Sequence, residues 1–392
     1  MSSFFKKISS DTNQENSPEN PQIPLKPKKR IALFLALAGL VILVPALGFA
    51  YWHSKQKDVP VVIIATPGAT SAPSAPATPA PTPTPALATS LLTGLMVPAG
   101  TENLHPLGVM IENTPDARPQ YGLGQADLVY EAIAEGGITR FYAIFADPTK
   151  AVRVEPVRSA RPYYVDLSNE VKAFFAHAGG SQDGLSEIKK TGAYDLDGLV
   201  LGSLFHRDTT RKVSSEHTLY SSTDQLWQYA TGTKGWPKTA DFAPWLFQDD
   251  IAVASRPASE APVKVSVTSA SFAVQWTYDP TTNSYKRVMA GVAHTDAGTG
   301  AQITAKNVIL QTAVRTNDTE RYGSIVKPIS RYALTGTGAA VIIQNGQAVK
   351  GTWKKAASDQ RTHFYDAAGA EVKFVRGNTW IQLVESNSTI SY

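Results

Sequence analysis

The chain has 392 residues, enough for two or three domains, and it contains no cysteine. The absence of cysteine excludes disulfides, thiolate metal sites, a cysteine nucleophile and a lipid-modified cysteine anchor. The formal charge of +4 comes from the first 58 residues, because residues 91–392 contain 29 basic and 29 acidic side chains; this neutral region does not favour nucleic acid as a partner.

An uncharged apolar segment runs from Ile31 to Trp52. A helix of this length spans the hydrocarbon core of a bilayer, which is about 30 Å thick. Four basic residues precede it at positions 26, 28, 29 and 30. They predict a cytoplasmic tail over 1–30, a transmembrane helix over 31–52 and an extracytoplasmic remainder, so that the membrane is an expected partner. A cleaved signal peptide ending near Gly48-Phe49-Ala50 is the alternative, and it also exports the rest of the chain.

Residues 53–90 are expected to form a stalk. From Val59 to Ser90 the sequence is rich in Pro, Ala and Thr and has no charge. Repeated proline favours extended polyproline II, and about 30 residues at about 3.1 Å each reach on the order of 90 Å. A flexible tether without a spacing role is the alternative.

The outer region is predicted to have two parts, a mixed α/β (α+β) domain over 91–255 and a β-rich subdomain over 256–392. In the first part, apolar runs predict strands at 107–111, 139–145 and 173–177, and helices begin near 181 and 223. In the second, strands are predicted at 263–267, 272–278, 307–314, 339–343 and 380–384. Asn345-Gly346 between apolar alternations predicts a tight hairpin.

Several runs of sequence are specific enough to indicate a family. They are GVMIENTPDARPQYGLGQADLVYEAIAEGGITRFYAIFAD at 108–147, VEPVRSARPYYVDL at 154–167, FFAHAGGS at 174–181, EHTLYSS at 216–222, YDPTTNSYKR at 278–287, HTDAGTGAQITAKNVI at 294–309 and GNTWIQLV at 377–384. Together they resemble both modules of the YerB-like family, a domain of unknown function found on bacterial extracytoplasmic lipoproteins. The resemblance covers about residues 91–386 and implies a fold and an address, but no activity.

The chain departs from the family pattern in two places. The lipid-bearing cysteine that the family implies is absent, and the apolar segment 31–52 stands in its place. Where the family pattern has Tyr-Arg-Asp, this chain has His206-Arg207-Asp208. The second departure leaves open any role that the resemblance would give to residue 206.

Three residues are candidates for catalysis. Glu131 and Glu135 are four positions apart and share one face of a strand or a helix, so they are a candidate acid–base pair for glycan cleavage. The alternative is a structural ion pair with Arg140 or another base. His177 ends an apolar run just before Gly179-Gly180, where α/β folds often place site residues. The alternative for His177 is a hydrogen-bonded residue of the core.

Arginines predict a ligand site for an anion. Arg118, Arg140, Arg158 and Arg161 lie in short segments punctuated by Gly and Pro, and Ser159 adds a hydroxyl. Their forked donors suit phosphate or carboxylate. The alternative is a buried arginine–carboxylate network with Glu131, Glu135 and Asp166. A polar loop adds further candidates that either join this site or close the loop, namely Arg207, Arg211, His217 and Tyr220.

Neither a metal nor a cofactor is predicted. The metal-ligating residue types His177, Asp183, His206, Asp208 and His217 lack the spacing of a metal motif. No Walker loop, GxGxxG fingerprint or GxSxG elbow is present.

Three functional hypotheses remain open. The first is an envelope protein that binds an anionic wall or lipid-linked ligand through the arginine cluster. The second is an enzyme that acts on envelope glycans or phosphodiesters with Glu131 or Glu135 and the arginines. The third is a non-catalytic scaffold for a partner protein. The sequence does not decide whether the protein is an enzyme.

Overall fold

The computed structural model describes residues 86–258 and 261–392. The expected cytoplasmic tail at 1–30, the expected transmembrane helix at 31–52 and residues 53–85 of the expected stalk lie outside the described residues. Within the described ranges, no helix is both long and apolar enough to cross a membrane. The end of the expected stalk forms β1 (Leu87–Thr89), which pairs antiparallel with β2 (Met96–Pro98).

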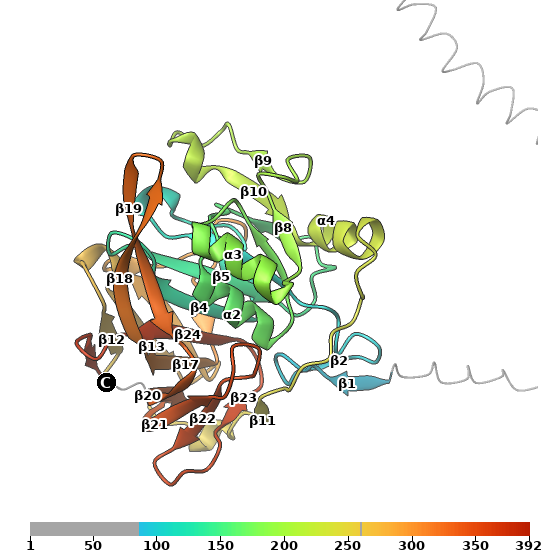
Figure 1. The fold of residues 1–392 in the computed structure, drawn as a ribbon. Coiled ribbons are helices and arrows are strands. Elements are labelled where there is room, and N and C mark those ends of the chain that lie inside the picture. The colour runs from blue at the N-terminus through green and yellow to red at the C-terminus, as the bar shows by residue number, and fades with distance from the viewer. Residues whose placement is uncertain (1–85, 259–260) are drawn as a thin grey trace, which may run out of the picture. The chain divides into compact units, whose positions relative to one another are not determined.

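A ten-stranded mixed sheet is the largest element of the described part (Figure 1). Its strands, in spatial order, are β22 (His363–Asp366), β21 (Gln347–Lys355), β20 (Gly336–Gln344), β17 (Asn307–Thr312), β24 (Thr379–Val384), β4 (Leu128–Ile133), β5 (Thr139–Phe145), β3 (Leu107–Glu112), β7 (Phe174–His177) and β8 (Asp195–Asp197). Strand β24 pairs in parallel with both β17 and β4. The regions before and after residue 256 therefore contribute neighbouring strands to one sheet.

The directions of the strands place the carboxyl ends of six of them on the same side of the sheet. Strand β24 is parallel to β17 and β4, whereas β5 is antiparallel to both β4 and β3. Strands β7 and β8 continue in parallel from β3. Strands β17, β24, β4, β3, β7 and β8 thus run in the same direction, and their carboxyl ends lie at one edge of the sheet.

The two faces of this sheet are covered differently. The first face packs against a second sheet of the order β15 (Val292–Ala293), β14 (Ser284–Met289), β13 (Val274–Asp279), β12 (Val263–Ser266) and β25 (Thr389–Ser391), with β16 (Thr304–Ala305) also paired to β14. Trp276 of β13 lies here in one buried cluster with Phe141 and Trp380. The opposite face packs against Tyr163, Tyr164 and other side chains of α2 (Pro162–Glu170).

Helical segments in the described part are short. Helix α3 (Gln182–Thr191) begins after Ser181, whose Oγ accepts a hydrogen bond from the Gly184 N–H at 3.1 Å, and it ends at Gly192 in the left-handed region. Helix α4 (Thr223–Gln228) continues into a π-helical turn at Tyr229–Thr233. The helices expected near 181 and 223 are confirmed, and the β-rich character after residue 256 is confirmed as well.

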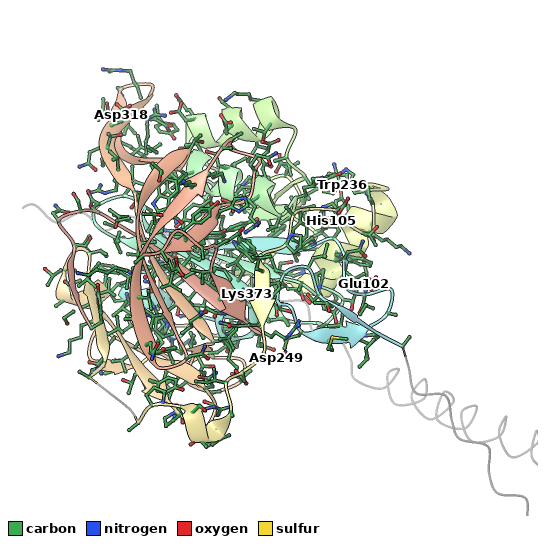
Figure 2. All side chains as sticks on the ribbon, turned by 90° about the horizontal axis from the view of Figure 1, so that it is seen from below. Glu102, His105, Trp236, Asp249, Asp318 and Lys373 are labelled. Carbon is green, nitrogen blue, oxygen red and sulfur yellow. The ribbon has the colours of Figure 1, made fainter. Side chains whose placement is uncertain are left out.

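A long two-stranded hairpin is the main element that the sequence did not predict. Strands β18 (Val314–Tyr322) and β19 (Ile325–Ala333) pair only with each other among the described strands and rise beside α2 and α3 (Figure 1). Asp318 marks this hairpin in Figure 2. Two small sheets complete the fold, β6 (Arg153–Val154) with β10 (Leu219–Ser222) and β9 (His206–Arg207), and β11 (Leu246–Gln248) with β23 (Lys373–Val375). We call residues 314–333 the hairpin arm.

Candidate functional site

Several predicted site residues lie at the carboxyl ends of strands in the ten-stranded sheet. Glu135 follows β4 by two residues and His177 ends β7, and Glu112, which was not predicted, ends β3. Ligands of α/β sheets commonly bind at the carboxyl ends of strands. These strand ends are therefore a candidate location for a site.

A pocket of about 370 Å³ opens at these strand ends. It brings together five of the residues that the sequence predicts, Glu135, Arg140, Arg158, Ser159 and Arg161. The hairpin arm supplies another wall with Glu320, Tyr322, Lys327, Pro328 and Ile329, and Ser181 and Glu216 complete the lining. We call this cavity the arginine pocket.

Glu135 is held by two of the arginines. Arg161 grips it with a fork, in which Nη2 donates to Oε2 at 2.6 Å and Nε pairs with Oε1. Arg140 Nη2 lies 3.5 Å from the same carboxylate, and its Nη1 donates to the Ser159 carbonyl at 2.9 Å. Burial works against ionisation of Glu135, but the hydrogen bond from Arg161 and the two arginine charges outweigh it, so its pKa lies below the ordinary value. Glu135 is therefore a carboxylate, poorly suited to donate a proton.

Arg158 has looser partners on the pocket side. Its Nη2 lies 3.1 Å from Glu112 Oε1, whereas its contacts with the Glu216 carboxylate are 3.4 and 3.5 Å long. Glu216 is 59% exposed in its side chain, so this second pair is weak. Nη1 also donates to the Glu216 carbonyl at 3.2 Å. The long contacts with the Glu216 carboxylate can be exchanged for contacts with a bound anion while Nη2 stays on Glu112.

Lys327 is the cation of the pocket that the hairpin arm contributes. Its ammonium lies 5.4 Å from the centre of the Tyr322 ring, and no ion pair joins it to a carboxylate of the described residues. The lining thus has four cations, Arg140, Arg158, Arg161 and Lys327, against the three carboxylates Glu135, Glu216 and Glu320. Glu112, which pairs with Arg158 from outside the lining, makes the charges of the cluster equal. Lys327, which has no carboxylate partner, is therefore the cation that favours an anionic occupant.

The hairpin arm is fastened to the amino end of α3 beside the pocket. Glu320 accepts hydrogen bonds from the N–H groups of Gln182 at 2.8 Å and Asp183 at 3.0 Å. Tyr322 donates its hydroxyl hydrogen to the same carboxylate at 2.7 Å. A carboxylate at this position satisfies free N–H groups and the positive end of the helix dipole. These contacts fix the wall that carries Lys327.

His217 lies next to the pocket in a pair with Glu112. Its Nδ1 is 2.9 Å from Glu112 Oε2, and the other carboxylate oxygen accepts a hydrogen bond from Thr114 Oγ1 at 2.9 Å. Both partners are largely buried, with 3% of the Glu112 side chain and 11% of the His217 side chain exposed. Glu112 was missed by sequence reasoning, although it stands at the end of a predicted strand, as His177 does.

Glu131 is placed away from the pocket. It points from β4 into the layer between the two sheets, where Oε2 pairs with Arg287 Nη2 at 2.8 Å and both side chains are fully buried. Thr139 Oγ1 donates to it at 3.1 Å and so does Trp380 Nε1, also at 3.1 Å. The structure therefore does not bring Glu131 and Glu135 to one cavity, and the structural ion pair is formed with Arg287.

Two more predicted residues are engaged elsewhere. His177 is fully buried, with Nδ1 2.8 Å from the Gly179 carbonyl and Nε2 2.9 Å from Asp195 Oδ1. Arg118 donates from Nε to Asn113 Oδ1 at 3.0 Å and from Nη1 to the Ser271 carbonyl at 2.8 Å. Neither side chain lines the arginine pocket. His177 and Arg118 therefore hold neighbouring loops in place.

The remaining three predicted residues, Arg207, Arg211 and Tyr220, lie in a separate cluster at the small sheet of β6, β9 and β10. Arg153 lies between the Tyr121 and Tyr220 rings, 4.5 and 4.1 Å from their centres, and pairs with the buried Glu155. Arg211 Nη1 reaches Glu155 at 3.2 Å, and Arg207 donates to the Ser215 carbonyl. Arg207, Arg211 and Tyr220 therefore hold this sheet together, away from the pocket lining.

A larger recess of about 610 Å³ lies at the ends of β17 and β24. Arg315 and Glu385 in its lining are ion-paired at 3.0 Å, and none of the residues predicted from the sequence lines it. Across the described ranges, no group of three or more His, Asp and Glu side chains has the arrangement of a metal site. The arginine pocket is the cavity at which prediction and geometry coincide.

Lys327, Glu320 and Glu216 are pocket residues that sequence reasoning missed. The first two belong to the hairpin arm, whose strands alternate too little in polarity to be recognised, and they are distant in sequence from the arginines. Glu216 directly precedes His217 within EHTLYSS, one of the runs that carry the family resemblance. The predicted role of His217 was therefore the signal that could have indicated Glu216.

Comparisons with known proteins agree with this architecture. Family models described as the N-terminal and C-terminal domains of "Protein of unknown function (DUF3048)" match residues 92–236 and 263–381. A Bacillus subtilis (strain 168) protein named "Putative lipoprotein YerB" is 33% identical over 296 residues, which are 75% of this chain and 85% of that protein. A crystal structure of the YerB protein from Bacillus subtilis is similar with a TM-score of 0.67 and 30% identity, over 78% of this chain and 100% of that chain. The expected resemblance is confirmed, and the chain belongs to the DUF3048 family of YerB-like proteins, with both of its modules.

Proposed function

We propose that this protein is a membrane-held, extracytoplasmic component of a bacterial cell envelope that binds an anionic group of a wall or lipid-linked ligand in the arginine pocket. The proposed location at the membrane and outside the cytoplasm is supported by the apolar segment 31–52 with its preceding basic residues, and by the name of the YerB relative as a lipoprotein. Because this chain has no cysteine to carry a lipid, the apolar segment would supply the anchor.

The charged groups of the pocket support an anion as the class of ligand. The three arginines of the pocket pair with Glu135, Glu112 and Glu216, whereas Lys327 lacks an acidic partner among the described residues. Ser159 adds a hydroxyl at the same wall. Forked guanidinium donors beside an ammonium and a hydroxyl suit a phosphate or a carboxylate.

The alternative of an enzyme that acts on envelope glycans or phosphodiesters with Glu131 or Glu135 and the arginines receives less support. Glu131 is fully buried in its pair with Arg287, and Glu135 is held in the fork of Arg161. A general acid or base needs to reach the group from which it takes, or to which it gives, a proton. The scaffold alternative has no observation that favours it over binding of an anion.

The proposal is tested by thermal unfolding of the full chain in detergent, with inorganic phosphate, pyrophosphate, acetate and a short-chain polyprenyl phosphate as probes. A probe at 100 times its dissociation constant adds about 2.7 kcal/mol to the free energy of unfolding. We expect stabilisation by the phosphate probes. Comparison of pyrophosphate with polyprenyl phosphate separates binding of the anion alone from binding that also needs the lipid.

The variant for this test combines Lys327→Ala with Arg158→Lys. This change removes the free ammonium and the forked donors but keeps a cation beside Glu112, so that no buried carboxylate is left without a partner. We expect it to abolish the shift caused by the probe. Lys350→Ala is the matched control, because Lys350 is exposed on β21 and does not line the pocket. An unchanged shift in the double variant, or no shift with any probe, would contradict the proposal.

A further inference from the structure

We propose that Glu112 and His217 form a general-base pair which hydrolyses a phosphodiester bound in the arginine pocket. This inference rests on the proposed binding of an anion in that pocket and adds a reaction to it. Within the pair, His217 would be the catalytic residue, and Glu112 would be the residue that positions it.

The pair has the geometry of an oriented base. A carboxylate oxygen of Glu112 lies 2.9 Å from His217 Nδ1, so that in the neutral ring Nδ1 carries the hydrogen and Nε2 keeps its lone pair. The carboxylate is itself fixed at its other oxygen by Thr114 Oγ1 at 2.9 Å and Arg158 Nη2 at 3.1 Å. An imidazole held in this way has one nitrogen left for chemistry.

His217 itself does not line the arginine pocket, but its neighbour in the chain, Glu216, does. The carboxylate oxygen nearest to His217 Nε2 is Glu216 Oε1 at 3.8 Å, which is beyond hydrogen-bond length. Nε2 has no hydrogen-bond partner among the described residues and is not fully buried, and 11% of the His217 side chain is exposed. Arg158, which contacts both Glu112 and Glu216, lines the pocket as well.

Four other histidines of the described residues do not offer the same arrangement. His177 has both ring nitrogens engaged, and so has His294, between Arg287 at 3.1 Å and Gln120 at 2.9 Å. His105 is buried and stacks on Phe174 with ring centres 3.9 Å apart, close to Trp236 in Figure 2. His363 pairs with Glu371 at 3.0 Å, but it lies on β22, the outermost strand on the other side of the ten-stranded sheet from β8.

A phosphodiester is the substrate class that fits both the arginine pocket and the Glu112–His217 pair. Its charged oxygens would be held by Arg158 and Lys327, so the reacting phosphorus would lie in the pocket itself. A carboxylate ligand, by contrast, would present an unreactive group at that position. His217 Nε2 takes a proton from water, and the water oxygen forms a new bond to phosphorus. The bond from phosphorus to the leaving oxygen breaks, and this oxygen receives the proton from Nε2.

The test uses bis(4-nitrophenyl) phosphate with the full chain in detergent, and absorbance of the released 4-nitrophenolate is the readout. We expect turnover that falls about 10²–10⁴-fold in His217→Gln, the usual contribution of general base catalysis. Glu112→Gln should lower kcat with little change in KM, because the amide can donate to Nδ1 and so reverse the tautomer. A merely structural role for Glu112 would not produce this separation of kcat from KM.

His363→Gln is the matched control, since it alters a similar His–Glu pair on the opposite edge strand, and it should keep wild-type turnover. Melting with pyrophosphate is measured on every variant to confirm folding and binding. Stabilisation by pyrophosphate without turnover would overturn the general-base pair and leave the binding proposal standing. Turnover that survives both His217→Gln and Glu112→Gln would also overturn the pair. If neither stabilisation nor turnover is found, both proposals fail.

Discussion

Glu131 and Arg287 form an ion pair that joins the two sheets from within. Both side chains are fully buried, and the guanidinium carbon lies 4.2 Å from the centre of the Trp380 ring and 5.0 Å from that of Trp276. Arg287 also donates from Nε to His294 Nδ1 at 3.1 Å. A buried charge without its partner costs far more than the pair contributes, so each residue depends on the other.

We therefore expect Arg287→Met to lower the free energy of unfolding by about 3–5 kcal/mol, because it leaves the Glu131 carboxylate buried and uncompensated. Adding Glu131→Gln should recover a large part of this loss, since the amide is neutral. Urea denaturation of the full chain and its variants measures both effects.

Lys286→Met is the control for this experiment. Lys286 precedes Arg287 on the same strand, but its ammonium pairs with Asp279 at 2.9 Å on the surface. An exposed pair of this kind contributes about 0–1 kcal/mol. If Arg287→Met were no more destabilising than Lys286→Met, the buried pair would not have the role described above.

The partner of Glu131 could not have been read from the sequence. The alternative of a structural ion pair was open there, but Arg287 lies 156 positions further along the chain and on a different sheet. Arg158, Arg161 and Ser159 were easier to predict, because they share one short segment with a pattern of donors. Local spacing predicts which residues can act together only when one segment carries them.

At the scale of elements, the turn between β20 and β21 follows directly from two residues. Asn345 and Gly346 have φ values of 53° and 75°, as a type I′ hairpin turn requires. A Cβ at Gly346 would lie 2.4 Å from Pro257 Cγ and 2.7 Å from Tyr278 Cε1. The hairpin expected at Asn345-Gly346 is confirmed, and the glycine is needed for both conformation and space.

Gly346→Ala should therefore destabilise the fold more than Gly369→Ala. At Gly369 φ is 82° and no atom lies within 4 Å of the added Cβ, so the cost is the backbone strain alone, about 1–2 kcal/mol. At Gly346 steric overlap adds about 1–3 kcal/mol to that strain. Thermal unfolding of the two variants measures the difference, and equal losses would show that Pro257 and Tyr278 move aside without cost.

The hairpin arm shows where element prediction fails. Its strands are mostly exposed, with Thr, Asn, Asp, Glu and Arg over 315–321, so the alternation that marks a half-buried strand is missing. It is held instead by specific contacts, such as Tyr332 Oη accepting from the Ile133 N–H at 3.0 Å and Glu320 at the start of α3. Such contacts depend on the whole fold.

At the scale of the molecule, one sheet unites the two modules of the family. Strand β24, from the end of the chain, lies between β17 and β4 and is parallel to both. The arginine pocket is likewise shared, with Arg140, Arg158 and Arg161 from the first module and Lys327 and Glu320 from the second. The family resemblance predicted both modules, but only the folded chain places their residues around one cavity.

The binding of an anion in this shared pocket is best tested by a crystal structure of the protein with pyrophosphate. We expect the anion in the arginine pocket, with oxygens within hydrogen-bond distance of the Arg158 guanidinium and the Lys327 ammonium. An empty pocket at pyrophosphate concentrations that saturate binding in solution, or an anion bound only at the Arg153 cluster or in the recess beside Arg315, would contradict it.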